Sequence, residues 1–172
     1  GGGLVRMRIA TEANNVFSGN KSIEFTLPIS TSEQGVGLIR RLSGYDTVYM
    51  RMYQKFDPGY NVPGSNHNGI RLSAKYPEVA GQKPPADGTG FFLFLLQNSI
   101  AGSHAGESAP GFTNLYVYWP RQRTQYGDHW YPDGTVIPYS NTIGNKGEWL
   151  AYPTQYPDFR VMPNFQPLRD RW

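Results

Sequence analysis

Short runs of β-forming residues, each bounded by Gly, Pro, Asn or Ser, recur along most of this chain. Because such breaks interrupt helices and fit the turns between strands, they disfavour an all-helical bundle. No apolar run approaches the roughly 20 residues of a membrane-spanning helix. We expect strands at Val5–Ala10, Ser22–Leu27, Gly37–Leu42, Thr47–Phe56, Gly69–Ala74, Phe91–Gln97 and Asn114–Trp119. The sequence therefore predicts an all-β fold, an antiparallel jelly roll or sandwich.

The 172 residues suffice for one domain, and aromatic rings make up 15% of them. So many rings would not stay solvated in a disordered chain. Charged residues make up only 17%, and the net charge of +3 comes from Lys and Arg scattered from Arg6 to Arg171. Because the cations form no stripe, we expect neither a nucleic-acid nor a membrane partner, and favour an acidic polysaccharide. Cysteine is absent, which excludes disulfides and thiolate metal sites.

Three of the expected strands alternate apolar side chains with aromatic or basic ones. The apolar faces would consist of Val48, Met50, Met52 and Phe56, of Ile70, Leu72 and Ala74, and of Leu115, Val117 and Trp119. The opposite faces would carry Tyr49, Arg51, Tyr53, Lys55, Arg71, Tyr116 and Tyr118. Flat rings stack on the faces of pyranoses, and cations pair with carboxylates, so this composition favours a sugar-binding groove. The alternative is an ordinary polar sheet face turned to water.

The strand pattern breaks down between about residues 121 and 167, where Pro, Gly and Tyr are dense. We expect this stretch to be a long loop whose rings pack against the sheet as a lid or groove wall. The last residues, Arg171 and Trp172, resemble the opening of a further strand. We therefore expect 1–172 to be a single sandwich domain that is incomplete at the C-terminus, with a partner polypeptide as one way to complete it.

The residues exclude several kinds of site. The three histidines are far apart in the sequence and in no zinc-binding pattern, and no phosphate-binding Gly motif, serine-nucleophile motif or convincing carboxylate pair is present. We therefore expect no metal and no cofactor. Cleavage of a uronic-acid polymer by β-elimination needs only a group that neutralises the carboxylate, a base and an acid. Arg, His and Tyr supply these three roles.

Four motifs taken in order resemble the jelly-roll polysaccharide lyases that include alginate and glucuronan lyases. These motifs are Val48–Asp57, Asn68–Leu72, Leu115–Pro120 and Tyr126–Gly127. The resemblance extends from about Lys21 to the end of the chain. It implies a concanavalin-like jelly-roll sandwich, β-elimination of a uronic-acid polysaccharide and a secreted or extracellular location. In that family a catalytic Lys stands where Arg71 stands here, and the paired tyrosines match Tyr116 and Tyr118.

From the residues and the resemblance together we expect Arg71 to neutralise the substrate carboxylate. His67 or Tyr118 would act as the base, and Tyr116 or Tyr118 as the acid. The residues expected to bind substrate are Tyr49, Arg51, Tyr53, Lys55, Asn68 and Gln97.

One departure from the family divides the functional hypotheses. Phe92 and Phe94 fall where the family has a Ser-x-Arg pair. Either the site is rebuilt with Gln97, Asn98 or His67, or lyase activity is lost. A non-catalytic carbohydrate-binding module on the same fold is therefore an alternative, and a structural protein completed by a partner chain is another.

Overall fold

The computed structural model describes residues 6–30, 34–61, 67–76, 85–98, 104, 106–120, 122, 126–138, 148–149 and 162–172. These residues form two antiparallel sheets and one short 3-10 helix, η1 (Ala13–Asn15), and they contain no α-helix. The predicted all-β class is therefore confirmed. In the described part of the chain, no helix has the length and apolarity to cross a membrane. The chain divides into two compact units, residues 1–55 with 171–172, and residues 56–170.

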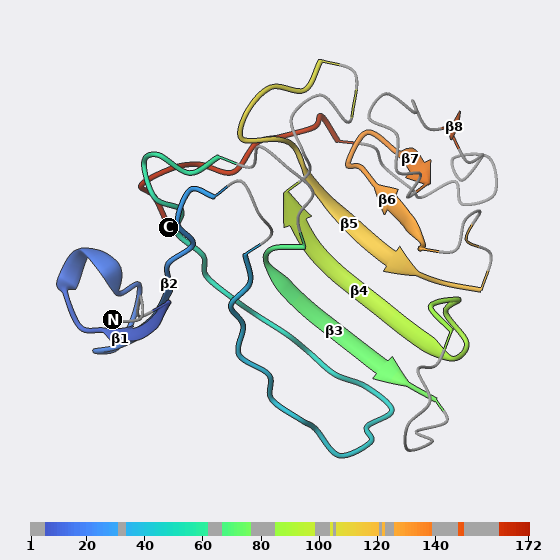
Figure 1. Ribbon diagram of the computed structural model, residues 1–172, viewed down its shortest axis with the longest axis horizontal. Helices are drawn as coiled ribbons and strands as arrows, with labels where there is room; N and C mark the ends of the chain where they lie inside the picture. The colour runs from blue at the N-terminus through green and yellow to red at the C-terminus, as the bar shows by residue number, and fades with distance from the viewer. Residues whose placement is uncertain are drawn as a thin grey trace. The chain divides into compact units, whose positions relative to one another are not determined.

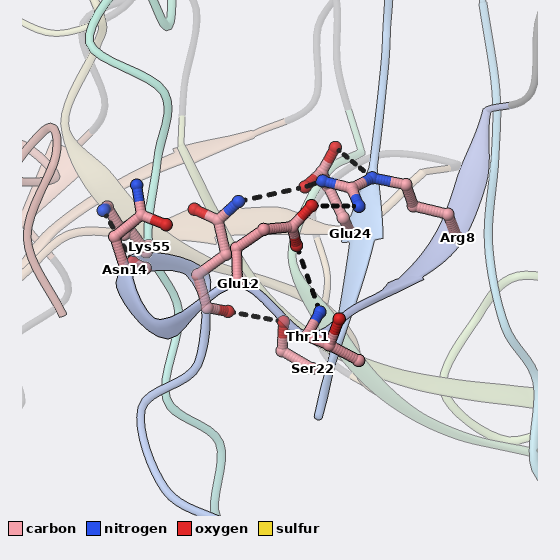
Figure 2. A network of polar contacts seen from close by, with 8 residues as sticks. Arg8, Thr11, Glu12, Asn14, Ser22, Glu24 and Lys55 are labelled. Atoms are coloured by element: carbon pink, nitrogen blue, oxygen red, sulfur yellow. Dashed lines mark hydrogen bonds and ion pairs between the residues drawn. The ribbon is translucent and has the colours of Figure 1, made fainter. Parts of the chain in front are cut away.

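The first unit contains a two-stranded sheet of β1 (Met7–Ala10) and β2 (Ser22–Phe25), in which Arg8 lies opposite Glu24. The Arg8 guanidinium donates from Nε and Nη2 to the two Glu24 carboxylate oxygens, at 3.0 and 2.6 Å. Its Nη1 donates to Glu12 Oε1 at 2.7 Å, so one cation holds two carboxylates (Figure 2). This network raises the pKa of Arg8 and lowers that of Glu12.

The second unit contains a six-stranded sheet in which each strand pairs with the next along the chain (Figure 1). The strands are β3 (Ile70–Lys75), β4 (Phe91–Asn98), β5 (Thr113–Tyr118), β6 (Asp128–Trp130), β7 (Thr135–Pro138) and β8 (Glu148–Trp149). All neighbouring pairs are antiparallel. Such a meander needs only short connections between strands.

The centre of this sheet is built by β4, which pairs along most of its length with β3 and β5. Its run of Phe and Leu suits a strand that has partners on both sides. Leu93 and Leu95 are buried and form a small core with Tyr116. At the β3 end of the sheet, the Lys75 ammonium lies 5.2 Å from the centre of the Phe91 ring.

Two expected strands are not formed. Residues 37–42 and 47–55 have no regular secondary structure, and Phe56 makes only an isolated bridge to Arg169. An alternating pattern produces a strand only where a neighbouring strand takes up the backbone hydrogen bonds. The expected apolar face is also open, since Met50 and Met52 are exposed like Tyr49. The prediction of a strand at Thr47–Phe56 was therefore wrong, and so was that of a strand at Gly37–Leu42.

The loop expected at about 121–167 is corrected in part, because β6, β7 and β8 lie within it. Between β6 and β7 the chain reverses in a turn that the sequence marks with Pro132, Asp133 and Gly134. Gly134 has a φ of +87°, and the Asp133 carboxylate accepts the Thr135 amide at 2.8 Å. Residues 139–147 and 150–161 of the expected loop lie outside the described residues.

Candidate functional site

Strand pairing places the chemically interesting side chains of the second unit on one face of its sheet. Directly opposite residues of antiparallel strands share a face, and Arg71, Leu95, Tyr116 and His129 are successive partners across β3, β4, β5 and β6. The period of two adds further residues to the same face. We call His67, Gln97, Asn114, Tyr116, Tyr118 and His129, which contact one another, the His–Tyr cluster.

Three rings stack at the centre of this cluster. Tyr116 lies between His67 and His129, with ring centres 4.8 and 4.7 Å away and planes within 14° and 22° of parallel. Only 1% of Tyr116 is exposed, and its hydroxyl donates a hydrogen bond to the Tyr126 carbonyl. Since a phenol carries one proton, the Tyr118 hydroxyl 3.4 Å away must donate to Tyr116 rather than accept from it. Tyr116 is thus the fixed floor of the cluster.

Two glycines allow the backbone to approach this floor closely. Gly127 follows the Tyr126 carbonyl with a φ of +74°, and a Cβ there would lie 2.3 Å from Val117 O. Gly69 connects His67 to β3 with a φ of +95°, and its Cβ would lie 2.0 Å from the Leu96 carbonyl oxygen. Any other residue would be both strained and in collision at these positions.

Two buried amides link the two histidines. The Asn114 amino group donates to the Phe112 carbonyl at 3.3 Å, and its Oδ1 lies 3.1 Å from His129 Nδ1. Gln97 Nε2 lies 3.5 Å from Asn114 Oδ1 and 3.2 Å from His129 Nδ1. The other end of Gln97, Oε1, lies 3.2 Å from His67 Nδ1. The polar contacts therefore run from the Phe112 carbonyl, just before β5, out to His67.

The two histidines have different surroundings. His129 is half-buried against Tyr116, Gln97 and Asn114, and the burial of its ring, with a smaller contribution from the charge of His67, lowers its pKa to about 3. It is therefore neutral near pH 7. His67 lies at the exposed side of the cluster. Of the two, His67 is the more exposed.

The structure brings together four of the residues predicted from the sequence, namely His67, Gln97, Tyr116 and Tyr118. Arg71 is exposed on the same face by strand register, and it makes no hydrogen bond or ion pair with any residue that the structure describes. Asn68 is half-buried and its amide is engaged, since Oδ1 accepts the Asn98 amide and Nδ2 donates to the Tyr60 hydroxyl. It anchors the segment that carries His67.

The other predicted residues belong to the first unit. They are Tyr49, Arg51, Tyr53 and Lys55. Tyr49 is 95% exposed, while Tyr53 stacks on Phe17 with ring centres 3.7 Å apart. Lys55 donates to the Asn14 carbonyl at 3.0 Å (Figure 2). The contacts of Tyr53 and Lys55 are structural contacts within that unit.

The structure places several of these side chains differently from what the sequence indicates. The tyrosine face of β5 was expected to be the open one, yet Tyr116 is buried while Leu115 and Val117 are only half-buried. Gln97 is 2% exposed, so it cannot bind a polymer directly. Phe92 and Phe94 lie on the sheet face opposite Gln97, because odd and even residues of a strand point to opposite sides. These two rings therefore do not occupy the cluster.

Sequence reasoning missed Asn114, His129 and the Tyr126 carbonyl. His129 was set aside because the histidines are distant in the sequence, but the β5–β6 pairing places it opposite Tyr116. The Pro132–Gly134 turn between two short runs of β-formers is a hairpin signal that could have revealed β6. Among the described residues, no group of three or more His, Asp or Glu side chains could hold a metal.

Comparison with known proteins identifies no similar protein. No protein-family profile, no curated protein and no solved structure matches this chain.

Proposed function

We propose that this chain binds a uronic-acid polysaccharide and cleaves it by β-elimination, on a sheet that forms part of a jelly-roll sandwich. The observation that carries the proposal is the exposed His67, held against buried Gln97 and stacked on the Tyr116 floor, with the Tyr118 hydroxyl beside that floor. A base and an acid on one rigid support are what the reaction requires.

The roles follow from position and chemistry. His67 takes the C5 proton of the uronic acid, and the electrons of that C–H bond form the C4–C5 double bond as the C4–O bond breaks. Tyr118 turns its hydroxyl from the 3.4 Å contact with Tyr116 toward the substrate and gives its phenolic proton to the departing glycosidic oxygen. Arg71, exposed on the same face, pairs with the carboxylate and so favours loss of the neighbouring proton. Tyr116 is buried, so it packs against the rings of His67 and Tyr118 and does not touch the polymer.

Hydrolysis suits this cluster less well. Glycoside hydrolases in general use two carboxyl groups that face the scissile bond. The His–Tyr cluster contains none, and the carboxylate of β6, Asp128, is fully buried and accepts the Trp119 indole N–H at 2.7 Å. Asp128 also lies on the opposite face from His129, its neighbour in the strand.

The test is ultraviolet absorbance of the unsaturated chain ends that β-elimination creates, measured on glucuronan, alginate and related uronans. We expect the wild-type protein to produce this absorbance, and Tyr118→Phe to lower the rate by about 100-fold or more, as loss of a general acid does. Tyr76→Phe is the matched control. Tyr76 is exposed, and it directly follows β3 at an even-numbered position, so it continues the sheet face opposite that of Arg71.

Two other results would contradict the proposal in different ways. Saturable uronan binding without any rise in absorbance would identify a non-catalytic binding module. Neither binding nor absorbance across the panel would remove the carbohydrate proposal altogether.

A further inference from the structure

The orientation of Asn114 is fixed by the backbone around it. Its amide could be turned either way, since the oxygen and nitrogen are similar in shape. Only the nitrogen can donate, however, and one end of the amide lies 3.3 Å from the Phe112 carbonyl, which can only accept. The nitrogen must face Phe112. Oδ1 therefore faces into the cluster as an acceptor.

This acceptor orients Gln97 in turn. The end of Gln97 that lies 3.5 Å from Asn114 Oδ1 must be its amino group, because a flipped amide would set two oxygens against each other. His129 Nδ1 is consistent with this orientation, since it can accept from Gln97 or donate to Asn114. Gln97 Oε1 then points to His67 Nδ1, 3.2 Å away.

We propose that Gln97 and Asn114 are positioning residues that hold His67 in the tautomer with its proton on Nδ1, so that Nε2 is the basic nitrogen. An oxygen can only accept, so the neutral His67 ring must carry its proton on the nitrogen that faces Gln97. The role of Nε2 as the base rests on the proposed lyase function, but the tautomer itself does not.

The same arrangement serves the ring after it has taken a proton. Protonation at Nε2 leaves the Nδ1–H···Oε1 bond in place, and a hydrogen bond to a charged group is stronger than one to a neutral group. His129 on the other side of Tyr116 stays neutral, so it does not repel the imidazolium. Tyr116 and the Gln97 amide both face His67, and neither is a base that competes for the substrate proton.

The tautomer can be read directly by NMR of the protein labelled with 15N in histidine. The nitrogen shifts of a neutral imidazole distinguish the protonated from the unprotonated nitrogen. We expect the wild-type protein to show Nδ1–H at His67. Gln97→Leu should shift His67 toward Nε2–H. Gln97→Glu should retain Nδ1–H, because its buried carboxyl group in the protonated form keeps an acceptor oxygen for His67 and a donor for Asn114 Oδ1. His104 is the internal control, and its signals should be the same in all three proteins.

The second readout is the steady-state kinetics, kcat and KM, of each variant on a uronan that the wild-type protein cleaves. Because Gln97 is buried and does not touch the polymer, Gln97→Leu should lower kcat by about tenfold or more and change KM by less than about threefold. A wrong tautomer in a catalytic triad costs far more than tenfold, so the lower bound is modest. Gln97→Glu should recover part of the loss.

The two proposals can fail separately. Nδ1–H at His67 in a protein that cleaves no uronan would overturn the lyase function and leave the positioning role of Gln97 standing. Nε2–H at His67 in the wild-type protein would overturn the positioning role whatever the activity. If Gln97→Leu does not fold, the wild-type tautomer still decides between these results.

Discussion

Gly127→Ala should damage the second unit far more than an ordinary glycine substitution. The residue has a φ of +74°, and a Cβ added there would lie 2.3 Å from Val117 O and 2.7 Å from Tyr118 Cδ1. Ordinary contact begins near 3.4 Å, so the Val117 carbonyl would have to retreat by about 1 Å from the chain that leads into β6. Both the β5–β6 pairing and the support of Tyr118 depend on that approach.

The expected loss has two parts. A left-handed backbone conformation costs an alanine about 1–2 kcal/mol relative to glycine. Forcing an additional methyl group into a packed region costs about 1–3 kcal/mol more. Gly127→Ala should therefore lower the free energy of unfolding by about 2–5 kcal/mol.

Gly106→Ala separates the two parts. Gly106 belongs to the same unit and has a φ of +78°, but nothing lies within 4 Å of its added Cβ. It should cost only about 1–2 kcal/mol, the backbone part alone. Urea unfolding followed by tryptophan fluorescence is a suitable assay, since Trp119 and Trp130, on either side of Gly127 in the sequence, pack edge to face. Equal losses in the two variants would refute the close approach at Gly127.

Two further predictions concern charge. In the unfolded chain His129 takes up a proton below about pH 6.5, whereas in the folded protein it stays neutral down to about pH 3. Acidification from about pH 6.5 to about pH 3 should therefore lower the free energy of unfolding, by at most about 1.4 kcal/mol per pH unit. His129→Phe, which keeps a ring against Tyr116, should flatten that slope in urea unfolding, and an unchanged slope would show that His129 is not enclosed. Arg8→Ala should destabilise the first unit at low salt, and the difference from wild type should shrink at high salt because the ion pairs with Glu12 and Glu24 are exposed. A difference that is independent of salt, measured by thermal unfolding, would speak against an electrostatic role.

The strands that sequence reasoning located correctly are those whose partners are close in the chain. β3, β4 and β5 agree with the expected ranges to within about one residue because their pairing is nearest-neighbour and their patterns are strong. Residues 47–56 alternate as regularly as β3 and β5, yet no strand forms there. Alternating apolar and polar residues indicate which side chains would share a face if a strand formed. Whether the strand forms depends on backbone hydrogen bonds to a neighbouring strand.

The candidate site was predicted in its residue types and only partly in its geometry. His67, Tyr116 and Tyr118 were chosen for their chemistry, and the structure brings them together. Which tyrosine is buried could not be predicted, because burial depends on what covers each sheet face. His129 and Asn114 could not be chosen without the strand register, since their contacts with Gln97 and Tyr116 connect them to His67.

The most direct measurement is the ultraviolet absorbance of wild-type protein, His67→Ala and Tyr76→Phe incubated with a panel of uronans. Cleavage through the exposed histidine predicts growing absorbance with wild type and Tyr76→Phe on at least one polymer, and almost none with His67→Ala. Undiminished absorbance with His67→Ala, or no absorbance with any of the three proteins, would contradict it.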